Sequence, residues 1–295
     1  MTFLTALSQP RKLILDGATG TELNRRGVDT GLPLWSANAL MNDRDAVILQ
    51  QIHEDYLRAG ADIITTNTFR THRRALAPSG NAGRARELTR RAVEVARAAL
   101  ANVPLDKPRF MAGSISTLED CYRPDLVPSD EELLDEHSDR VIDLIECGVD
   151  LILIETINSI READVMARLA TATGTPVVVS FVCDREGRIL SGESLTDAAA
   201  ALLPLGISAI GVNCGPTPNL AIPLAELQAA CGNDFPLIAY GNIGYADVEV
   251  GWVNTDSENP MAYCSHAIHW PAKIIGGCCG TTPEHIAELK AALGG

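Results

Sequence analysis

The strongest constraint on the fold is a repeated pattern in which a helical segment ends at a glycine and a short apolar run follows. Gly60, Gly148 and Gly206 each end such a segment, and the runs IITTN, LILIET and AIGVNC follow them. Glycine here supplies the left-handed conformation that commonly ends a helix. Because the runs do not alternate between apolar and polar residues, they predict strands buried on both faces, as in a parallel sheet.

Eight such runs occur along the chain, and helical stretches separate them. The predicted strands are residues 13–15, 63–66, 110–113, 151–155, 177–181, 209–213, 237–240 and 274–277. Eight strand–helix units in 295 residues predict an α/β fold, specifically a (β/α)8 TIM barrel. A doubly wound open sheet is the alternative, but it accounts for fewer strands and gives no single ring of sites. No linker interrupts the pattern, so we expect residues 1–295 to form a single domain.

The clearest helix is predicted over residues 129–148. Ser129 and Glu132 have the spacing of a capping box. The stripe with helical periodicity that follows consists of Leu133, Leu134, His137, Val141, Leu144 and Ile145. The last helix is predicted to open at Thr282, with Pro283 in its first turn.

In a barrel of this kind, catalytic groups lie at the carboxyl-terminal ends of the strands. The residues at those positions are Asp16, Asn67, Ser114, Glu155, Cys214, Tyr240 or Asn242, and the pair Cys278 and Cys279. Polar and metal-binding side chains are therefore expected to meet on one rim, which favours an enzyme.

Three of the eight cysteines lie at two of these strand ends. Cys214 occurs in GVNCGP, and Cys278 and Cys279 occur in GGCCG, where the glycines allow the chain to turn both sulfur atoms toward one point. Three thiolates suit zinc and leave one tetrahedral position open, which is typical of catalytic zinc. A chance pair of buried thiols is the alternative.

The remaining cysteines are scattered, and we expect them to be buried, inert thiols. They are Cys121, Cys147, Cys183, Cys231 and Cys264. No secretion signal is convincing, so metal binding or catalysis is expected ahead of disulfides.

Zinc would deprotonate a bound substrate thiol, and three anionic ligands would keep that sulfur electron-rich enough to attack a methyl group.

At these residues the chain resembles the homocysteine S-methyltransferase family. The resemblance runs through LDGATGTEL, PLWSA, ADIITTNTFR, AGS, LILIET, GVNCGP and GGCCGTTPEHI. It implies a (β/α)8 barrel in which Cys214, Cys278 and Cys279 hold zinc and homocysteine binds to the zinc through its sulfur. The predicted product is methionine.

The resemblance also implies a pocket for the amino-acid part of homocysteine. Glu155 would meet the amino group, and the segment DGATG would supply an acidic residue and backbone N–H groups. The predicted substrate-binding residues are Asp16, Gly17, Ala18, Thr19, Ser114, Glu155, Asn213 and Trp35. Taken alone, Asp16 is equally compatible with a turn or cap, whereas a carboxylate ending an apolar run, as Glu155 does, is costly without a partner.

The methyl donor is the next question that the resemblance raises. Relatives use sulfonium compounds (S-methylmethionine or S-adenosylmethionine), betaine or methylcobalamin, and this chain looks most like the short, stand-alone S-methylmethionine type. Trp35 could hold a cationic donor by cation–π attraction, with Phe69 and Tyr240 as weaker candidates. The alternative is a tryptophan that packs a loop.

Two segments that border the donor side depart from the family pattern. One follows residues 110–113, and the other precedes the last strand. Their acidic residues Asp120, Asp125, Asp247 and Glu249 could neutralise a cationic donor. A solvated acidic loop is the alternative for each of them.

The formal net charge of −14 disfavours nucleic acid and anionic membranes as partners. No signal peptide and no run of about 18 apolar residues is found, so we expect a cytoplasmic protein. Its expected partners are small-molecule substrates, and it is expected to be a monomer or small homo-oligomer. The predicted function is zinc-dependent methyl transfer from a sulfonium donor to homocysteine. The alternatives are transfer from betaine, a thetin or a corrinoid, and a non-enzymatic zinc or thiol sensor.

Overall fold

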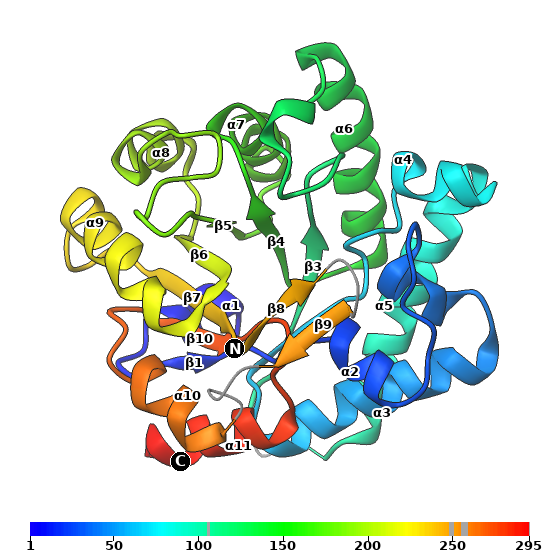
Figure 1. The fold of residues 1–295 in the computed structure, drawn as a ribbon, viewed down its shortest axis with the longest axis horizontal. Helices are drawn as coiled ribbons and strands as arrows, with labels where there is room; N and C mark the ends of the chain where they lie inside the picture. Colours follow the sequence, from blue (N-terminus) through cyan, green and yellow to red (C-terminus); the bar gives the residue numbers. More distant parts are fainter. Residues whose placement is uncertain (105–106, 248–250, 255–258, 295) are drawn as a thin grey trace.

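The computed structural model describes residues 1–104, 107–247, 251–254 and 259–294 (Figure 1). Eight parallel strands form its central sheet. They are β1 (Leu13–Ile14), β2 (Ile63–Thr65), β3 (Phe110–Ile115), β4 (Leu151–Ile157), β5 (Val177–Phe181), β6 (Ala209–Pro216), β7 (Leu237–Asn242) and β10 (Ile274–Gly277). The order in the sheet is β1-β10-β7-β6-β5-β4-β3-β2. A parallel bridge between Leu15 and Ile63 joins its two edges, so the sheet closes into a (β/α)8 TIM barrel.

Helices follow each strand and surround the barrel (Figure 1). They are α2 (Gly20–Arg25), α3 (Asp43–Ala59), α4 (Arg73–Leu76), α5 (Ala85–Asn102), α6 (Asp130–Cys147), α7 (Ile160–Thr171), α8 (Leu195–Leu202), α9 (Ala221–Cys231), α10 (Pro260–Ala267) and α11 (Pro283–Ala292). None of the helices in the described part of the chain is both long and apolar enough to cross a membrane.

The apolar core has two layers. The larger lies between the strands and the surrounding helices. The smaller fills the barrel interior with side chains such as Leu13, Leu153 and Ile274. The amino-terminal helix α1 (Phe3–Leu7) belongs to this inner layer, where the rings of Phe3 and Phe110 meet edge to face at 5.7 Å. One end of the barrel is thereby closed, which leaves the opposite rim for the site.

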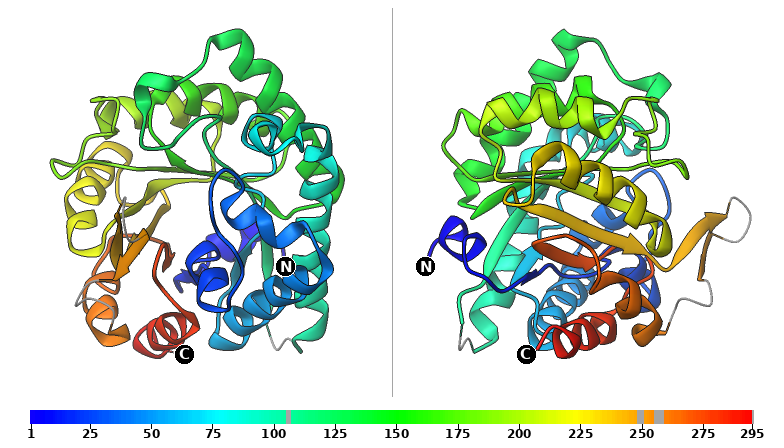
Figure 2. Two further views of the ribbon diagram at one scale, coloured as in Figure 1. Left: turned by 45° about the vertical axis from the view of Figure 1, so that its right-hand side comes forward. Right: turned by 90° about the vertical axis from the view of Figure 1, so that its left-hand side faces the viewer.

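An antiparallel hairpin made of β8 (Gly244–Asp247) and β9 (Gly251–Asn254) continues from β7. It stands out from the barrel on the side opposite α1 (Figure 2). Neither α1 nor this hairpin was predicted from the sequence. The hairpin therefore marks the rim at which the carboxyl-terminal ends of the strands lie.

The predicted strands and caps are confirmed, with changes at their ends. All eight strands occur, but β3, β4, β6 and β7 extend two or three residues further than predicted. The capping box of Ser129 and Glu132 opens α6, and Gly148 ends it in the left-handed conformation. The predicted stripe is wrong at Leu134, which is exposed because it lies about 100° around the helix from the buried Leu133.

Candidate active site

The predicted site residues lie at the carboxyl-terminal ends of the strands, on the rim opposite α1. Two of these strands are irregular there: the pairing of β4 shifts register between Ile154 and Ile157, and that of β6 between Asn213 and Pro216. A β-bulge turns side chains away from their regular alternation. Glu155 and Cys214 each lie within one of these irregular segments.

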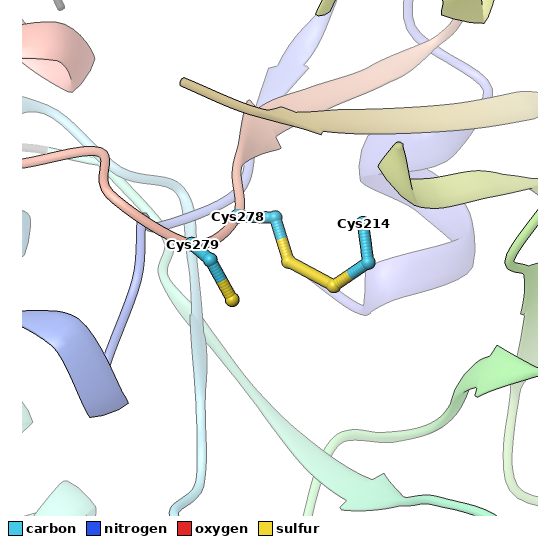
Figure 3. Close-up of side chains that lie close together, drawn as sticks. All are labelled: Cys214, Cys278 and Cys279. Atoms are coloured by element: carbon cyan, nitrogen blue, oxygen red, sulfur yellow. A yellow bond between two sulfur atoms is a disulfide. The ribbon is translucent and has the colours of Figure 1, made fainter. Parts of the chain in front are cut away.

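Cys214, Cys278 and Cys279 come together at the rim (Figure 3). Their sulfur atoms all lie within 4.8 Å of one another. A tetrahedral zinc ion with Zn–S bonds of about 2.3 Å needs sulfur atoms about 3.8 Å apart. The three side chains therefore fit a metal ion, and among the described residues they are the only such group of His, Cys, Asp or Glu.

The oxidation state of this cluster differs from the expectation of three thiols. Cys214 and Cys278 are joined by a disulfide, while Cys279 is free. The strand ends hold the two backbones close, with a Cα–Cα distance of 5.7 Å, which suits a disulfide. A metal-binding form of the cluster requires this bond to be reduced.

Close backbone packing positions Cys278 and Cys279. The N–H of Cys278 donates to the carbonyl of Gly241 on β7, and its own carbonyl accepts from the backbone and side chain of Thr281. A Cβ atom on Gly276 would lie 2.6 Å from the Cβ of Leu15 and 2.8 Å from the carbonyl oxygen of Asp16. Only glycine fits there, and a Cβ atom on Gly277 would likewise lie 2.3 Å from the Thr281 hydroxyl oxygen, so both glycines before the cysteines are required by packing.

Burial raises the pKa of the Cys279 thiol to about 12, and the nearby Glu155 carboxylate acts in the same direction. Without a cation, this thiol therefore stays protonated at neutral pH. A bound metal ion supplies the positive charge that a buried thiolate needs.

Glu155 projects from β4 into a buried polar setting. Its carboxylate accepts hydrogen bonds from the Ser114 hydroxyl on β3 and, at 3.0 Å, from the Tyr240 hydroxyl on β7. Burial raises the pKa of Glu155, and these two hydrogen bonds oppose the rise. The structure thus brings Glu155 and Ser114 together and adds Tyr240, which was predicted at a strand end and as a weaker candidate for the aromatic wall.

Asp16 follows β1 and is also buried. Its carboxylate accepts from the Thr65 backbone N–H at 2.7 Å and from the Thr65 hydroxyl at 2.8 Å. Burial raises the pKa of Asp16 to about 7, and repulsion from Glu155 adds to the rise. The sequence did not single out Thr65, although its position at the end of a predicted strand was a usable signal.

A third buried carboxylate, near the opposite end of the barrel, provides a contrast. Asp62 forms ion pairs with Arg11 at 2.9 Å and Lys107 at 2.7 Å, and these contacts lower its pKa. In the described part of the chain, Asp16 and Glu155 contact no cationic side chain. Buried charges are normally paired, so these two carboxylates mark a place for a cationic ligand group.

The DGATG turn packs closely against Tyr56 and Thr281, which leaves fewer of its backbone N–H groups for an anion. A Cβ atom on Gly17 would lie 2.8 Å from the Tyr56 ring and from the Thr281 hydroxyl oxygen. The N–H of Ala18 already donates to this oxygen at 3.1 Å, and the carbonyl of Ala18 accepts from the Tyr56 hydroxyl. The Ala18 N–H is thus engaged by a protein group in this structure, and the contact of Ala18 with substrate stays a prediction.

Asn213 was predicted to contact substrate, but the polar atoms of its side chain form hydrogen bonds with protein groups. Its Oδ1 accepts from the Thr156 N–H at 3.0 Å and from the Ser180 hydroxyl at 2.8 Å. Its Nδ2 donates to the Thr156 hydroxyl at 2.7 Å. Asn213 therefore ties β4, β5 and β6 together behind the site.

Another amide, Asn242 at the end of β7, lies beside the first cysteine. Its Nδ2 donates to the carbonyl of Cys214 at 2.8 Å. Its Oδ1 is buried and has no hydrogen-bond partner among the described residues. Sequence reasoning placed Asn242 at a strand end but gave it no role.

Trp35 lies beside the DGATG turn. Its indole ring fills the space next to Gly20, where a Cβ atom would lie 2.3 Å from the ring. The ring also meets Phe69 edge to face at 5.8 Å. Two half-buried aromatic side chains from different loops thus form one wall at the rim.

The acidic residues of the loop after β3 contact other residues of the same loop. Asp125 forms an ion pair with Arg123 at 2.6 Å, and Asp120 accepts from the N–H of Tyr122. These contacts fit the solvated-loop interpretation. The side chain of Asp247 and the whole of Glu249 lie outside the described residues.

Comparisons with known proteins agree with one another. A family model described as homocysteine S-methyltransferase matches residues 13–293. Homocysteine S-methyltransferase YbgG from Bacillus subtilis (strain 168) is 32% identical, over 95% of this chain and 93% of the relative. The crystal structure of the homocysteine methyltransferase MmuM from Escherichia coli in its metallated form has a TM-score of 0.83 and 31% identity, covering 97% of this chain and 98% of that chain. The oxidized form of MmuM has the same TM-score and identity and covers 97% of both chains.

Proposed function

This chain belongs to the homocysteine S-methyltransferase family, and we propose that it uses zinc held by three cysteines to move a methyl group from a sulfonium compound to homocysteine. Methyl transfer to homocysteine follows from the family, so the chain is a methyltransferase with small-molecule substrates. The zinc ion, the methyl donor and the roles of individual residues are what we propose. We also propose that residues 1–295 act as one homocysteine-binding barrel domain.

The observation that carries the proposal is the cluster of Cys214, Cys278 and Cys279 beside two buried carboxylates that contact no cationic side chain in the described part of the chain. The three sulfur atoms are a donor set that zinc favours, and they leave one tetrahedral position for a substrate thiol. The crystal structure of MmuM in a metallated form supports metal binding by this chain. When bound, zinc would supply the positive charge that keeps the homocysteine sulfur deprotonated at neutral pH.

Glu155 and Asp16 are proposed to bind the homocysteine ammonium group. Both are buried carboxylates without a cationic partner among the described residues, and an ammonium group between them would offset their mutual repulsion. The hydroxyl groups of Ser114 and Tyr240 fix the Glu155 carboxylate in place. Asn242 Oδ1, at the end of β7 on the same rim, is a further buried hydrogen-bond acceptor.

The carboxylate of homocysteine is proposed to bind the backbone N–H groups of the DGATG turn. Ala18 is engaged with Thr281, so Gly17 and Thr19 remain the donors in this proposal. The absence of a Cβ atom on Gly17 matters here, because any larger side chain would collide with Tyr56 and Thr281. Asn213 acts from behind the pocket by holding the backbone next to Glu155.

In the reaction, the homocysteine sulfur attacks the methyl carbon of the sulfonium donor. A new S–C bond forms while the donor S–C bond breaks, and its electron pair returns to the donor sulfur, which leaves as a neutral thioether. The only proton released is that of the homocysteine thiol, which goes to solvent. No general base is needed at the reacting carbon.

Trp35 and Phe69 are proposed to hold the cationic donor. Aromatic faces attract sulfonium and quaternary ammonium groups, and a site that excludes water strengthens this attraction. The pair lies beside the DGATG turn, so the donor would approach from the side of the loops after β1 and β2. A betaine or thetin donor is the second candidate, since its cationic, methyl-bearing group suits the same aromatic wall.

A direct test is to incubate the reduced, zinc-loaded protein with homocysteine and one donor at a time. The donors are S-methylmethionine, S-adenosylmethionine, betaine and methylcobalamin, and the methionine formed is quantified. Methionine from a sulfonium donor supports the proposal, and methionine from betaine or methylcobalamin alone overturns the donor assignment. A cytoplasmic location and a monomeric or small homo-oligomeric state remain predictions from the sequence.

A further inference from the structure

Thr156 and Cys214 have backbone conformations that residues other than glycine rarely adopt. Thr156 has φ of 59° and Cys214 has φ of 54°, both in the left-handed region. For a β-branched residue such as threonine, this conformation costs on the order of 1–3 kcal/mol. Each residue lies in the irregular segment of its strand, so both strand irregularities are built around a strained backbone.

A buried hydrogen-bond network holds Thr156 in this conformation. Asn213 accepts from the Thr156 N–H at 3.0 Å and donates to the Thr156 hydroxyl at 2.7 Å. The Ser180 hydroxyl donates to the same Asn213 oxygen at 2.8 Å. Because the Thr156 N–H can only donate, the orientation of the Asn213 amide is fixed by its partners.

This network determines where the Thr156 hydroxyl hydrogen points. The hydroxyl oxygen accepts from Asn213 Nδ2, so its own hydrogen is left to donate elsewhere. The sulfur of Cys214 lies 3.8 Å away, within the range of hydroxyl–sulfur contacts. In the disulfide this sulfur is neutral and a weak acceptor, whereas a thiolate is a much stronger one.

We infer that Thr156, held by Asn213, is a positioning residue that donates a hydrogen bond to the Cys214 thiolate of the metal site. The inference rests on the proposed function, because it requires Cys214 to be a metal ligand. The hydrogen bond withdraws negative charge from one of the three sulfur atoms and fixes the orientation of that ligand. Partners of metal ligands commonly change metal affinity 10–100-fold when they are removed.

Thr156 and Asn213 also connect the metal ligands to the amino-acid pocket. Thr156 directly follows Glu155, and Asn213 directly precedes Cys214. The three hydrogen bonds of Asn213 therefore fix the position of the carboxylate relative to the first cysteine across β4, β5 and β6. A substrate that is held by its ammonium at one point and by its sulfur at the other depends on that spacing.

The test uses the full-length, reduced protein loaded with Co²⁺ alone, whose thiolate-to-metal charge-transfer bands report the charge on the sulfur ligands. Thr156→Val keeps the shape and removes the hydroxyl, and Thr156→Ser keeps the hydroxyl. We expect the charge-transfer bands of Thr156→Val to move to longer wavelength and its zinc dissociation constant, measured by chelator competition, to rise about 10–100-fold. Thr156→Ser is expected to restore both wild-type values.

Thr156→Gly covers the case in which Thr156→Val does not fold. Glycine relieves the strained backbone and lacks the hydroxyl, so it should fold and show the same spectral shift. Wild-type spectra and zinc affinity in both variants that lack the hydroxyl would overturn the inference, as would a shift that Thr156→Ser fails to reverse. A wild-type protein that binds neither Co²⁺ nor Zn²⁺ would instead overturn the proposed function and the inference with it.

Discussion

Replacing Glu155 by glutamine should weaken homocysteine binding and, at the same time, stabilise the ligand-free protein. The carboxylate is buried, its pKa is raised by that burial, and its only side-chain partners among the described residues are the hydroxyls of Ser114 and Tyr240. In the ligand-free protein the charge therefore lacks compensation. With homocysteine bound, the proposed ammonium contact provides that compensation.

The size of the binding effect follows from the setting of the carboxylate. Removing one partner of a buried, hydrogen-bonded charge pair costs about 2–5 kcal/mol. Glutamine is almost isosteric and keeps an oxygen that can accept from Ser114 or Tyr240, so we expect the lower part of that range. This corresponds to a rise in the homocysteine dissociation constant of roughly 30–150-fold.

Calorimetric titration of the reduced, zinc-loaded protein measures this effect, with 4-mercaptobutanoate as the matched ligand that lacks the amino group. Wild-type protein should bind homocysteine more tightly than this analogue, and Glu155→Gln should lose that preference while binding the analogue normally. Differential scanning calorimetry of the ligand-free proteins should show a higher Tm for Glu155→Gln.

Ser114→Ala is the control, since it removes one hydrogen bond to the carboxylate and leaves the charge in place. It should weaken homocysteine binding by about 1 kcal/mol, or roughly fivefold. An unchanged preference for homocysteine over the analogue in Glu155→Gln would refute the assignment of the ammonium to this carboxylate.

Three further predictions follow from the same site. Cys279→Ala should lose stoichiometric zinc, measured by metal analysis, while its circular dichroism stays that of a folded barrel, and Cys231→Ala on α9 should retain zinc; zinc retained by Cys279→Ala would contradict the three-ligand site. Trp35→Leu should raise the donor KM about 2–30-fold in steady-state assays, because cation–π contacts contribute about 0.5–2 kcal/mol, and an unchanged KM would remove Trp35 from the donor site. The pKa of Asp16 is raised from 3.8 to about 7, so the folded protein holds a proton that the unfolded chain releases. Its free energy of unfolding should therefore fall by up to about 4 kcal/mol between pH 4 and 7. Urea titrations of Asp16→Asn should lack that part of the pH dependence, and an identical profile would argue against a buried, titrating Asp16.

Much of the fold could be predicted because its signals are local. Unbroken apolar runs predicted strands buried on both faces, and all eight were found. The glycine-ended helices and the Ser129 cap were equally readable. Strand ends were less certain, since β4 and β6 continue through irregular segments that hydrophobic patterning does not reveal.

The site could be predicted at the level of strand ends but not of individual contacts. Cys214, Cys278 and Cys279 meet as expected because parallel strands end on one rim. The left-handed conformation of Thr156 is invisible in a sequence, since threonine does not signal a positive φ. The engagement of Asn213 with Thr156 and of Ala18 with Thr281 depends on contacts between distant strands, which no local pattern encodes.

The hairpin after β7 was missed for a different reason. The segment around it was interpreted as a variable loop on the donor side. Alternating residues in YADVEVGWV were the available signal for a two-stranded ribbon. The two strands of the hairpin are short, so their alternating pattern was less distinct than the unbroken apolar runs of the barrel strands.

X-ray absorption at the zinc edge would show whether these cysteines bind zinc and present the homocysteine sulfur, because it counts the sulfur atoms bound to the metal. For the reduced, zinc-loaded protein without substrate, we expect three sulfur ligands and one lighter atom. Adding homocysteine should convert this to four sulfur ligands. A zinc shell that keeps three or fewer sulfur ligands at saturating homocysteine would contradict the claim that these cysteines present the substrate sulfur for methyl transfer.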